Sequence, residues 1–183
     1  MNHLTDLAEL IIRRNKIDND IATLIRRPAL TGHIGEYIAS QIFGISLVES
    51  ASTKAIDGHF TGQPLAGHTV NVKYYPKNEG VLDLKLDAAP NYYLVLTGPR
   101  TSAASSRGAP RPLVVELVYL FESRALVDAL RRRGVLLGQA TSVIKDLWDE
   151  AEIYPSKGNS ALILSDEQRR LLALFATVPR EVS

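Results

Sequence analysis

The segment 56–75, IDGHFTGQPLAGHTVNVKYY, contains three residue types that together suit hydrolysis of a phosphodiester bond. Asp57 supplies an anionic oxygen, the kind of ligand that a hard divalent cation prefers. Such an ion polarises the scissile phosphate and acidifies a bound water. Asn71 offers a further oxygen, and Lys73 is suited to hold the attacking water or to stabilise charge on the phosphoryl oxygens. This chemistry requires the three side chains to converge.

Two predicted strands position these side chains. The pattern indicates strands at about 56–61 and 68–75, with Asp57 near the start of the first. Side chains alternate between faces along a strand, so Asn71 and Lys73 are expected to share one face of the second. The short connection is rich in glycine and proline, which favours an antiparallel hairpin. That pairing brings Asp57 near the strand that carries Asn71 and Lys73.

Helical spacing dominates the first 43 residues. We expect one amphipathic helix at the N-terminus and a second that begins near Asp18 and is ended by Pro28. Thr31 is the expected N-cap of a third helix, and Gly44 its stop signal.

Beyond Gly44 the spacing of the apolar residues changes to that typical of strands and later returns to that typical of helices. Further strands are expected at 45–50, 91–97 and 113–121, followed by helices at 123–133 and from Ser165, where a capping box with Gln168 is predicted. This order predicts an α/β fold with a mixed β-sheet flanked by helices.

Three short motifs resemble those of the PD-(D/E)XK nucleases, the restriction-endonuclease-like superfamily. They are Gly35-Glu36 on a helix, Ile56-Asp57-Gly58, and Val70-Asn71-Val72-Lys73. The order of elements is also similar over roughly residues 30–97. The resemblance implies a restriction-endonuclease-like core that runs helix, three strands, helix, strand, with extra N- and C-terminal helices. It also implies an endonuclease that cleaves DNA with Mg²⁺ or Mn²⁺ as its cofactor.

The same resemblance implies a role for each matching residue. Asp57 corresponds to the metal-binding aspartate and Lys73 to the catalytic lysine. Glu36 corresponds to the acidic residue of the first core helix, and the backbone carbonyl of Val72 to a further metal ligand. Asn71 departs from the pattern, because this position usually holds an acidic residue. An amide oxygen can bind a cation but adds no negative charge, so the affinity for metal is expected to be lower.

We expect a single restriction-endonuclease-like domain over 1–183, with its core at roughly 30–121, an N-terminal helical extension at 1–28 and a C-terminal extension at 134–183. By analogy with the superfamily, the expected substrate is double-stranded DNA, the expected assembly a homodimer, and the setting restriction or phage defence.

Residues that contact nucleic acid are expected outside the metal site. The loop 98–112 contains Arg100, Arg107 and Arg111 and no acidic residue, so it carries three positive charges toward a phosphate backbone. A plain connector explains the loop equally well. His59 lies two residues after Asp57, so both side chains are expected on the same face of the predicted strand. Tyr75 is suited to stack on a base. Packing explains His59 without a functional role, and strand propensity explains Tyr75 in the same way.

Composition narrows the possible classes of protein. The chain has 183 residues, 21 basic against 20 acidic side chains, a formal net charge of +1 and no cysteine. Disulfide scaffolds, thiolate metal sites and cysteine nucleophiles are therefore excluded. The N-terminus has its charges in the wrong order for a secretory signal, and no apolar run is long enough to span a membrane. We therefore expect a soluble cytoplasmic protein without membrane association.

Two other interpretations remain open at this stage. The same fold can serve as a catalytically inactive nucleic-acid-binding or protein-interaction module, with Asn71 marking the loss of catalysis. Alternatively, the arrangement is a coincidence. Asp57 followed by Gly58 also suits a plain turn, Lys73 suits an exposed strand face, and Glu36 suits the solvent side of a helix.

Overall fold

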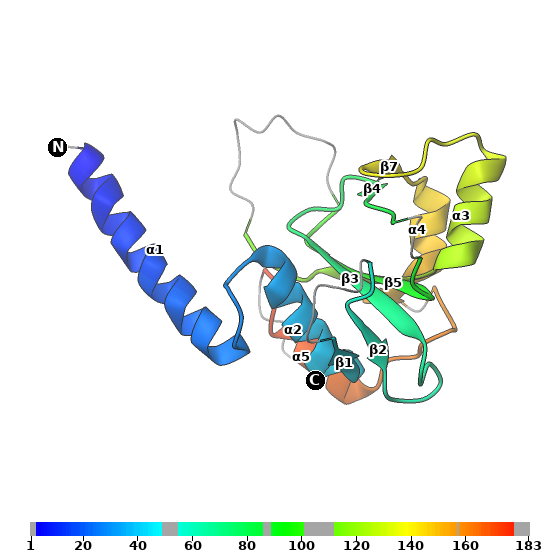
Figure 1. Cartoon of the computed structure of the whole chain (residues 1–183), viewed down its shortest axis with the longest axis horizontal. Coiled ribbons are helices and arrows are strands. Elements are labelled where there is room, and N and C mark those ends of the chain that lie inside the picture. The colour runs from blue at the N-terminus through cyan, green and yellow to red at the C-terminus, as the bar shows by residue number, and fades with distance from the viewer. Residues whose placement is uncertain (1–2, 49–54, 86–88, 101–111, 157, 178–183) are drawn as a thin grey trace.

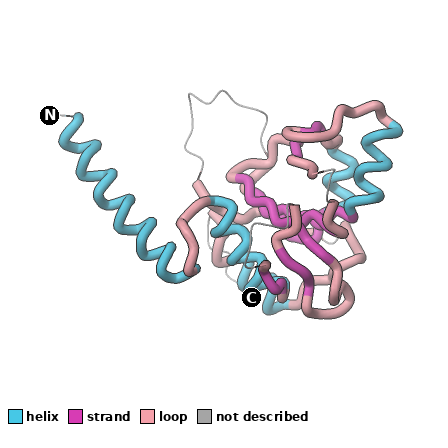
Figure 2. The backbone as a smooth tube through the Cα atoms, in the orientation of Figure 1, coloured by secondary structure: helices cyan, strands magenta, loops and turns pink. Residues whose placement is uncertain are grey.

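The computed structural model describes residues 3–48, 55–85, 89–100, 112–156 and 158–177. These residues form an α/β fold in which helices cover both faces of a six-stranded mixed sheet (Figure 1). Figure 2 shows the strands gathered at the centre of the body, with one helix extending away from it. The predicted α/β class and the mixed sheet with flanking helices are confirmed.

The N-terminal region forms one long helix and one shorter helix. Helix α1 (His3–Ile25) runs without a break, so the predicted separate helix from Asp18 is wrong. The stretch contains no glycine or proline, and the side chains of Arg14 and Asp18 form an i,i+4 ion pair at 3.5 Å across the expected boundary. None of the described helices combines the length and apolar character needed to cross a bilayer.

Helix α2 (Thr31–Phe43) ends as the sequence predicts but begins differently. Gly44 adopts the left-handed conformation, with φ of 63°, and its N–H bonds to the carbonyl of Ser40. Thr31, however, is the first helical residue and not the cap. Leu30 precedes the helix with an extended backbone and gives no side-chain cap.

The large sheet has the strand order β1-β2-β3-β5-β6-β8. Its strands are β1 (Ile45–Leu47), β2 (Gly58–Phe60), β3 (Thr69–Tyr75), β5 (Tyr92–Thr97), β6 (Leu117–Glu122) and β8 (Glu152–Tyr154). Neighbours are antiparallel except β3 and β5, which are parallel. The predicted antiparallel hairpin of β2 and β3 is confirmed, and β3 and β5 match their predicted ranges to within one residue.

The crossover from β3 to β5 differs from the core that the resemblance implies. A helix is expected there, but the described residues of 76–91 contain only β4 (Val81–Leu82), which pairs antiparallel with β7 (Thr141–Ser142). Leu82 and Leu84 are buried while Val81 and Lys85 are exposed, and this alternation is typical of a strand-like segment. Helix α3 (Ser123–Arg132) instead follows β6.

Two hydrophobic cores lie on the two faces of the sheet. On one face, α2 and α5 (Asp166–Ala173) pack over Val70, Val72 and Tyr74 of β3. On the other face, α3 and α4 (Lys145–Ala151) and the β4 segment pack over Tyr93, Val95, Tyr119 and Phe121, the last two from β6. Asn71 and Lys73 pair with Tyr93 and Val95 across the β3–β5 ladder, so their side chains lie on this second face.

The C-terminal residues complete both cores. Trp148 of α4 is packed against Tyr119 and Phe121, with ring centroids at 4.6 and 5.0 Å. Ile153 of β8 and Leu172 of α5 are buried in the opposite core. Ser165 caps α5 with the predicted capping box to Gln168. The described residues of 134–177, in a region that the sequence leaves without a role, are therefore integral to the fold.

Candidate functional site

The candidate site lies where β2 separates from β3. The Cα pairing of the two strands includes Gly58 with Val70, and the N–H of Asp57 donates to the Val70 carbonyl at 2.9 Å. One step further along β3, the N–H of Val72 donates to Oδ2 of Asp57 at 2.7 Å. The carboxylate thus occupies the edge of β3 at the place where a partner strand would continue.

The backbone carbonyl of Val72 faces the same gap. Within a strand, the N–H and C=O of one residue point toward the same neighbouring strand. Because the N–H of Val72 points toward Asp57, its carbonyl oxygen points to that side as well. This geometry is compatible with the ligand role that the sequence resemblance implies for Val72.

Lys73 is half-buried on β3, with its side chain on the second face of the sheet. Burial lowers the pKa of the Lys73 ammonium, because the charged form loses hydration. The negative charges of Asp57 and Asp83 oppose that shift and raise the pKa of Lys73. The acid and the lysine therefore share one electrostatic environment, as the predicted hairpin requires.

The pKa of Asp57 is raised above its ordinary value of 3.8. Burial is the largest cause, and the negative charge of Glu36 acts in the same direction. The hydrogen bond from the Val72 N–H and the positive charges of Lys73 and Arg27 lower the pKa of Asp57 and partly offset the effect of burial. Because burial makes the charged form of this carboxylate unfavourable, a cation placed nearby would stabilise it.

Glu36 reaches the site from α2, on the opposite face from Lys73. Its side chain is only 16% exposed and forms an ion pair with Arg27, so it does not lie on the open surface. Gly35 brings the helix close to β3, since a Cβ at this position would lie 2.5 Å from the Cβ of Tyr74. The Gly35-Glu36 pair therefore combines a close helix–strand approach with an acid near Asp57.

Asn71 is buried, with 4% exposure, and its two amide atoms differ in their bonding. Its Nδ2 donates to the carbonyl of Ala55 at 3.1 Å and holds the segment that leads into Asp57. Ala55 has a φ of 75°, an unfavourable region for a residue with a side chain. Oδ1 of Asn71 accepts no hydrogen bond within the described part of the chain. A buried acceptor without a partner is costly unless a water or an ion satisfies it.

The structure adds charged residues that the sequence analysis did not select. Asp83, in the β3–β5 crossover, accepts from the hydroxyl of Tyr75 at 3.3 Å and from the N–H of Ala140 at 2.7 Å. Asp83 and Lys85 both act on the pKa of Lys73. In the sequence LDLK at 82–85, Asp83 and Lys85 alternate with Leu82 and Leu84, which indicates that the two charged side chains share one side of the segment but not that this side lies near Lys73.

Three of the five expected nucleic-acid contacts, His59, Tyr75 and Arg100, lie in the described part of the chain. His59 is exposed on β2, and the Tyr75 hydroxyl is bonded to Asp83. Arg100 donates to Oδ1 of Asp149 at 2.9 Å and to the Tyr119 hydroxyl at 3.3 Å, so its guanidinium is held against α4 and β6. Arg107 and Arg111 lie outside the described residues.

The candidate metal ligands are all oxygen atoms, as Mg²⁺ prefers. They combine the carboxylates of Asp57 and Glu36 with the unpartnered Asn71 Oδ1 and the Val72 carbonyl. Within the ranges that the structure describes, no group of three or more histidine, aspartate or glutamate side chains is placed to hold a metal. The donor set thus fits a hard cation in kind, with less negative charge than three carboxylates provide.

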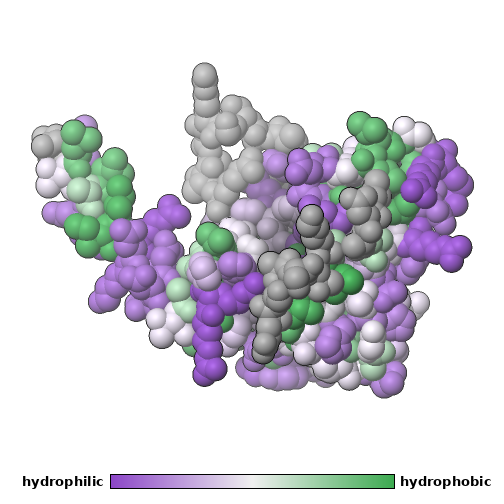
Figure 3. All heavy atoms as spheres, in the orientation of Figure 1, coloured by the Kyte–Doolittle hydropathy of each residue, from purple (hydrophilic) through white to green (hydrophobic). Residues whose placement is uncertain are grey.

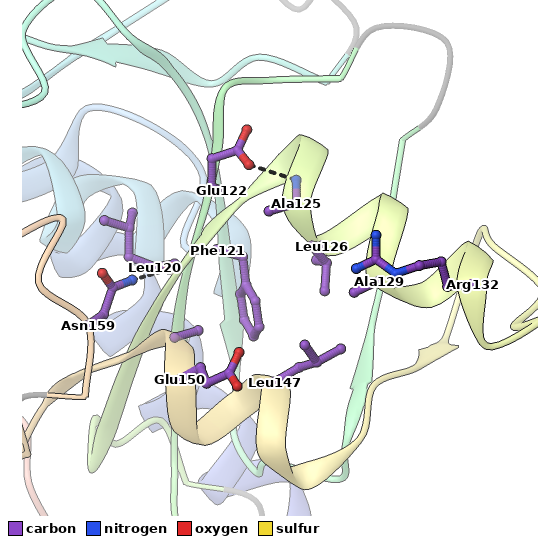
Figure 4. Close-up of a pocket in the computed structure, with 11 residues that line it drawn as sticks. Leu120, Phe121, Glu122, Ala125, Leu126, Ala129, Arg132, Leu147, Glu150 and Asn159 are labelled. Atoms are coloured by element: carbon purple, nitrogen blue, oxygen red, sulfur yellow. Dashed lines mark hydrogen bonds between the residues drawn. The ribbon is translucent and has the colours of Figure 1, made fainter.

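A separate cavity of about 490 Å³ lies between α3, α4 and β6. Phe121, Leu126 and Leu147 form its apolar floor, and the charged side chains of Glu150 and Arg132 lie at its rim (Figure 4). None of the candidate catalytic residues lines this cavity. The cavity and the Asp57–Lys73 site are therefore distinct features of the molecule.

Comparison with known proteins leaves the site to be interpreted from its own chemistry. No protein-family model matches the chain, and no curated protein matches it significantly.

Proposed function

We propose that this protein is a Mg²⁺-dependent endonuclease of the PD-(D/E)XK type that hydrolyses phosphodiester bonds in DNA. The observation that carries the proposal is the position of Asp57 at the open edge of β3, in the same electrostatic environment as Lys73. A half-buried acid of raised pKa, directly before β2, and a lysine of lowered pKa on β3 form a combination typical of sites where charges are tuned for catalysis.

Each residue has a distinct role in this proposal. Asp57, Glu36, Oδ1 of Asn71 and the carbonyl of Val72 would hold the cation, which when bound would polarise the phosphate. The Val72 N–H fixes the orientation of the Asp57 carboxylate. Lys73, as an ammonium, donates a hydrogen bond to the attacking water or to a phosphoryl oxygen. Arg27 positions Glu36 through their ion pair.

The wider setting follows from the same proposal. Duplex DNA has two strands to cleave, and a homodimer would supply two sites. A role in restriction or phage defence, in the cytoplasm, would give such an enzyme its substrate. His59, Tyr75 and the loop arginines Arg100, Arg107 and Arg111 remain the proposed contacts to nucleic acid.

A second candidate function is an inactive nucleic-acid-binding module on the same scaffold. It is favoured by Asn71, whose amide supports the Ala55 backbone and adds no charge for a metal. In this alternative, Asp57 and Lys73 serve binding and folding without cleavage.

Supercoiled plasmid incubated with Mg²⁺ or Mn²⁺ separates the two functions. Asp57→Ala and Lys73→Met are expected to lower the cleavage rate by about a hundredfold or more. Lys16→Met on α1 and Asp146→Asn on α4, both at exposed positions, are the matched controls and should cleave as the wild type does. DNA retention on a gel without cleavage in either metal would contradict the nuclease and support the module.

A further inference from the structure

Helix α1 exposes a row of large apolar side chains. It extends away from the body of the molecule (Figure 1), and Figure 3 shows exposed apolar surface over its N-terminal part. Leu7, Leu10, Ile17 and Leu24 are between 51% and 70% exposed, and Ile25 is its one buried residue among those described. Most of the stability of a helix in a protein comes from packing an apolar face. The described residues of the chain leave this face of α1 uncovered.

The spacing of the apolar residues is that of a coiled-coil seam. Alternate steps of three and four residues connect six positions of the helix, five of them apolar. In a heptad these are the a and d positions, which interdigitate with the same positions of a second helix. The six positions, called the α1 seam here, are Leu7, Leu10, Arg14, Ile17, Ile21 and Leu24.

The α1 seam is complementary to itself in the antiparallel direction. If two copies cross midway between residues 15 and 16, Leu7 lies opposite Leu24 of the second copy, and Leu10 lies opposite Ile21. Arg14 then lies opposite Ile17, and every position of the seam has a partner. A parallel pair in register would instead place Arg14 against its own copy, and two like charges in a seam repel each other.

The charged positions beside the seam favour the same arrangement. Arg13 and Asp20 both occupy the g position, and g positions face each other in an antiparallel pair. Each Arg13 would therefore lie near Asp20 of the second copy, and symmetry forms this pair twice. A membrane surface is a poorer partner, because Asp6, Glu9, Asp18 and Asp20 offset the basic residues on the polar side of α1.

We propose that α1 is a dimerisation helix that pairs antiparallel with α1 of a second copy of this chain. The proposal names the surface that would join the two protomers, and it does not depend on the nuclease activity. It is therefore tested by molar mass without any nucleic acid or metal, so that its failure and the failure of the proposed function are separate results.

The first test compares Leu10→Glu with Ile12→Glu by sedimentation equilibrium. Wild type is expected to have twice the mass of the 20.1 kDa chain. Leu10→Glu places a carboxylate in the α1 seam twice and should weaken the dimer on the order of a hundredfold or more. Ile12 is 68% exposed on the opposite side of the same helix, so Ile12→Glu should leave the dimer unchanged. A wild type that is monomeric at its highest soluble concentration, or a Leu10→Glu variant that remains dimeric, would overturn the proposal.

A charge exchange tests the register without changing the apolar seam. Arg13→Glu and Asp20→Arg each create two repulsive pairs and should weaken the dimer by about threefold to tenfold. The double variant restores opposite charges and should return to wild-type affinity. If the double variant instead shows the summed loss of dimer affinity of the two single variants, the predicted register is contradicted. Fluorescence of the single tryptophan, Trp148, reports whether the body remains folded in each variant.

Crosslinking tests the direction of the two helices. The chain has no cysteine, so single cysteines can be introduced without background. When Leu7→Cys and Leu24→Cys chains are mixed and oxidised, the antiparallel pair should give the mixed disulfide. A disulfide formed mainly between two Leu7→Cys chains would show a parallel pair and overturn the proposal.

Discussion

Oδ2 of Asp57 accepts a hydrogen bond from the backbone N–H of Val72 at 2.7 Å, beyond the last backbone pairing of β2 with β3. A side chain thus takes a position that the backbone of a neighbouring strand would otherwise occupy. The bond fixes the carboxylate relative to β3, and hence relative to Lys73 on the same strand. The orientation of the candidate acid is therefore set by backbone geometry, which no substitution at Lys73 should disturb.

Asn71→Asp tests the two roles of the Asn71 amide. The aspartate loses the donor to the Ala55 carbonyl and places a carboxylate near it, so the free energy of unfolding should fall by about 1–3 kcal/mol. If Oδ1 is a metal ligand, Mg²⁺ should raise the melting temperature of this variant more than that of wild type. Thermal unfolding with and without Mg²⁺ measures both effects.

The matched control is Asn78→Asp. Asn78 is equally buried and donates from Nδ2 to the Tyr119 hydroxyl at 3.0 Å, but it lies outside the candidate site. It should be destabilised similarly and gain nothing from Mg²⁺. Equal responses of the two variants to Mg²⁺ would remove Asn71 from the candidate ligands.

Asp57→Asn should stabilise the protein at neutral pH in the presence of a chelator. Burial raises the folded-state pKa of Asp57 above 3.8, so folding takes up a proton between pH 3.8 and that raised pKa. The free energy of unfolding therefore falls as the pH rises through this window, and the penalty is fully present above it. Asparagine avoids the charge and keeps an oxygen for the Val72 N–H. Its advantage in melting temperature should shrink as the pH falls through the window.

Asp149→Asn is a control that should change the stability at neutral pH in the opposite direction. Hydrogen bonds from Lys145 and Arg100 lower the pKa of Asp149, so its carboxylate stabilises the folded state above its ordinary pKa and loses that effect in acid. This variant should be the less stable one at neutral pH, with the difference closing as the pH falls. The same sign for both variants would contradict the assigned environment of Asp57.

Asp83→Asn is expected to change the pH dependence of cleavage. The negative charge of Asp83 raises the pKa of Lys73, so its removal should let burial lower that pKa further. If Lys73 acts as an ammonium, the loss of activity on the alkaline side should move to lower pH. The rate profile of plasmid cleavage measures the shift, and Asp128→Asn on the exposed side of α3 is the control. An unchanged alkaline limb would show that Lys73 is not the group that titrates there.

Gly35→Ala should destabilise the protein, whereas Gly32→Ala in the same helix should not. A Cβ at Gly35 would lie 2.5 Å from the Cβ of Tyr74, so α2 would have to move away from β3. Overpacking of this kind costs about 1–3 kcal/mol. At Gly32 the nearest atom is Oε1 of Glu36 at 4.0 Å, and alanine favours a helix over glycine by about 0.5–1 kcal/mol. Urea unfolding of both variants compares the two, and equal stabilities would contradict the close approach.

The elements that the sequence predicts well are those with strong local signals. The hairpin of β2 and β3, the left-handed Gly44 and the capping box of Ser165 with Gln168 are all confirmed. The predicted start of a second helix near Asp18 is wrong, because α1 continues through this position and Arg14 and Asp18 form an i,i+4 ion pair across it. Short elements such as β4, β8 and α4 were missed, since their order depends on long-range pairing and not on local propensity.

In the candidate site, too, local patterns are predicted from the sequence and long-range contacts are not. Alternation along the strand and the hairpin predict that Asp57 lies near Lys73, and in the structure the charge of each acts on the pKa of the other. Asp83 could not be placed from the pattern alone, because it comes to the site through the crossover and a contact with Ala140, 57 residues away. Arg27 likewise reaches Glu36 across the turn between α1 and α2. Ion pairs between separate elements leave no periodic signal in a sequence.

The small β4–β7 sheet ties the crossover beside Lys73 to a stretch of chain that comes after α3. The Asp83 carboxylate accepts a hydrogen bond from the N–H of Ala140, and the N–H of Leu84 donates to the carbonyl of Gly138. Truncating the protein after α3 would therefore remove the strand pairing and the hydrogen bonds that hold Asp83 and Leu84 in place. A fragment that ends at α3 is expected to lose this part of the fold, so any fragment used to test the proposed activity must keep these later residues.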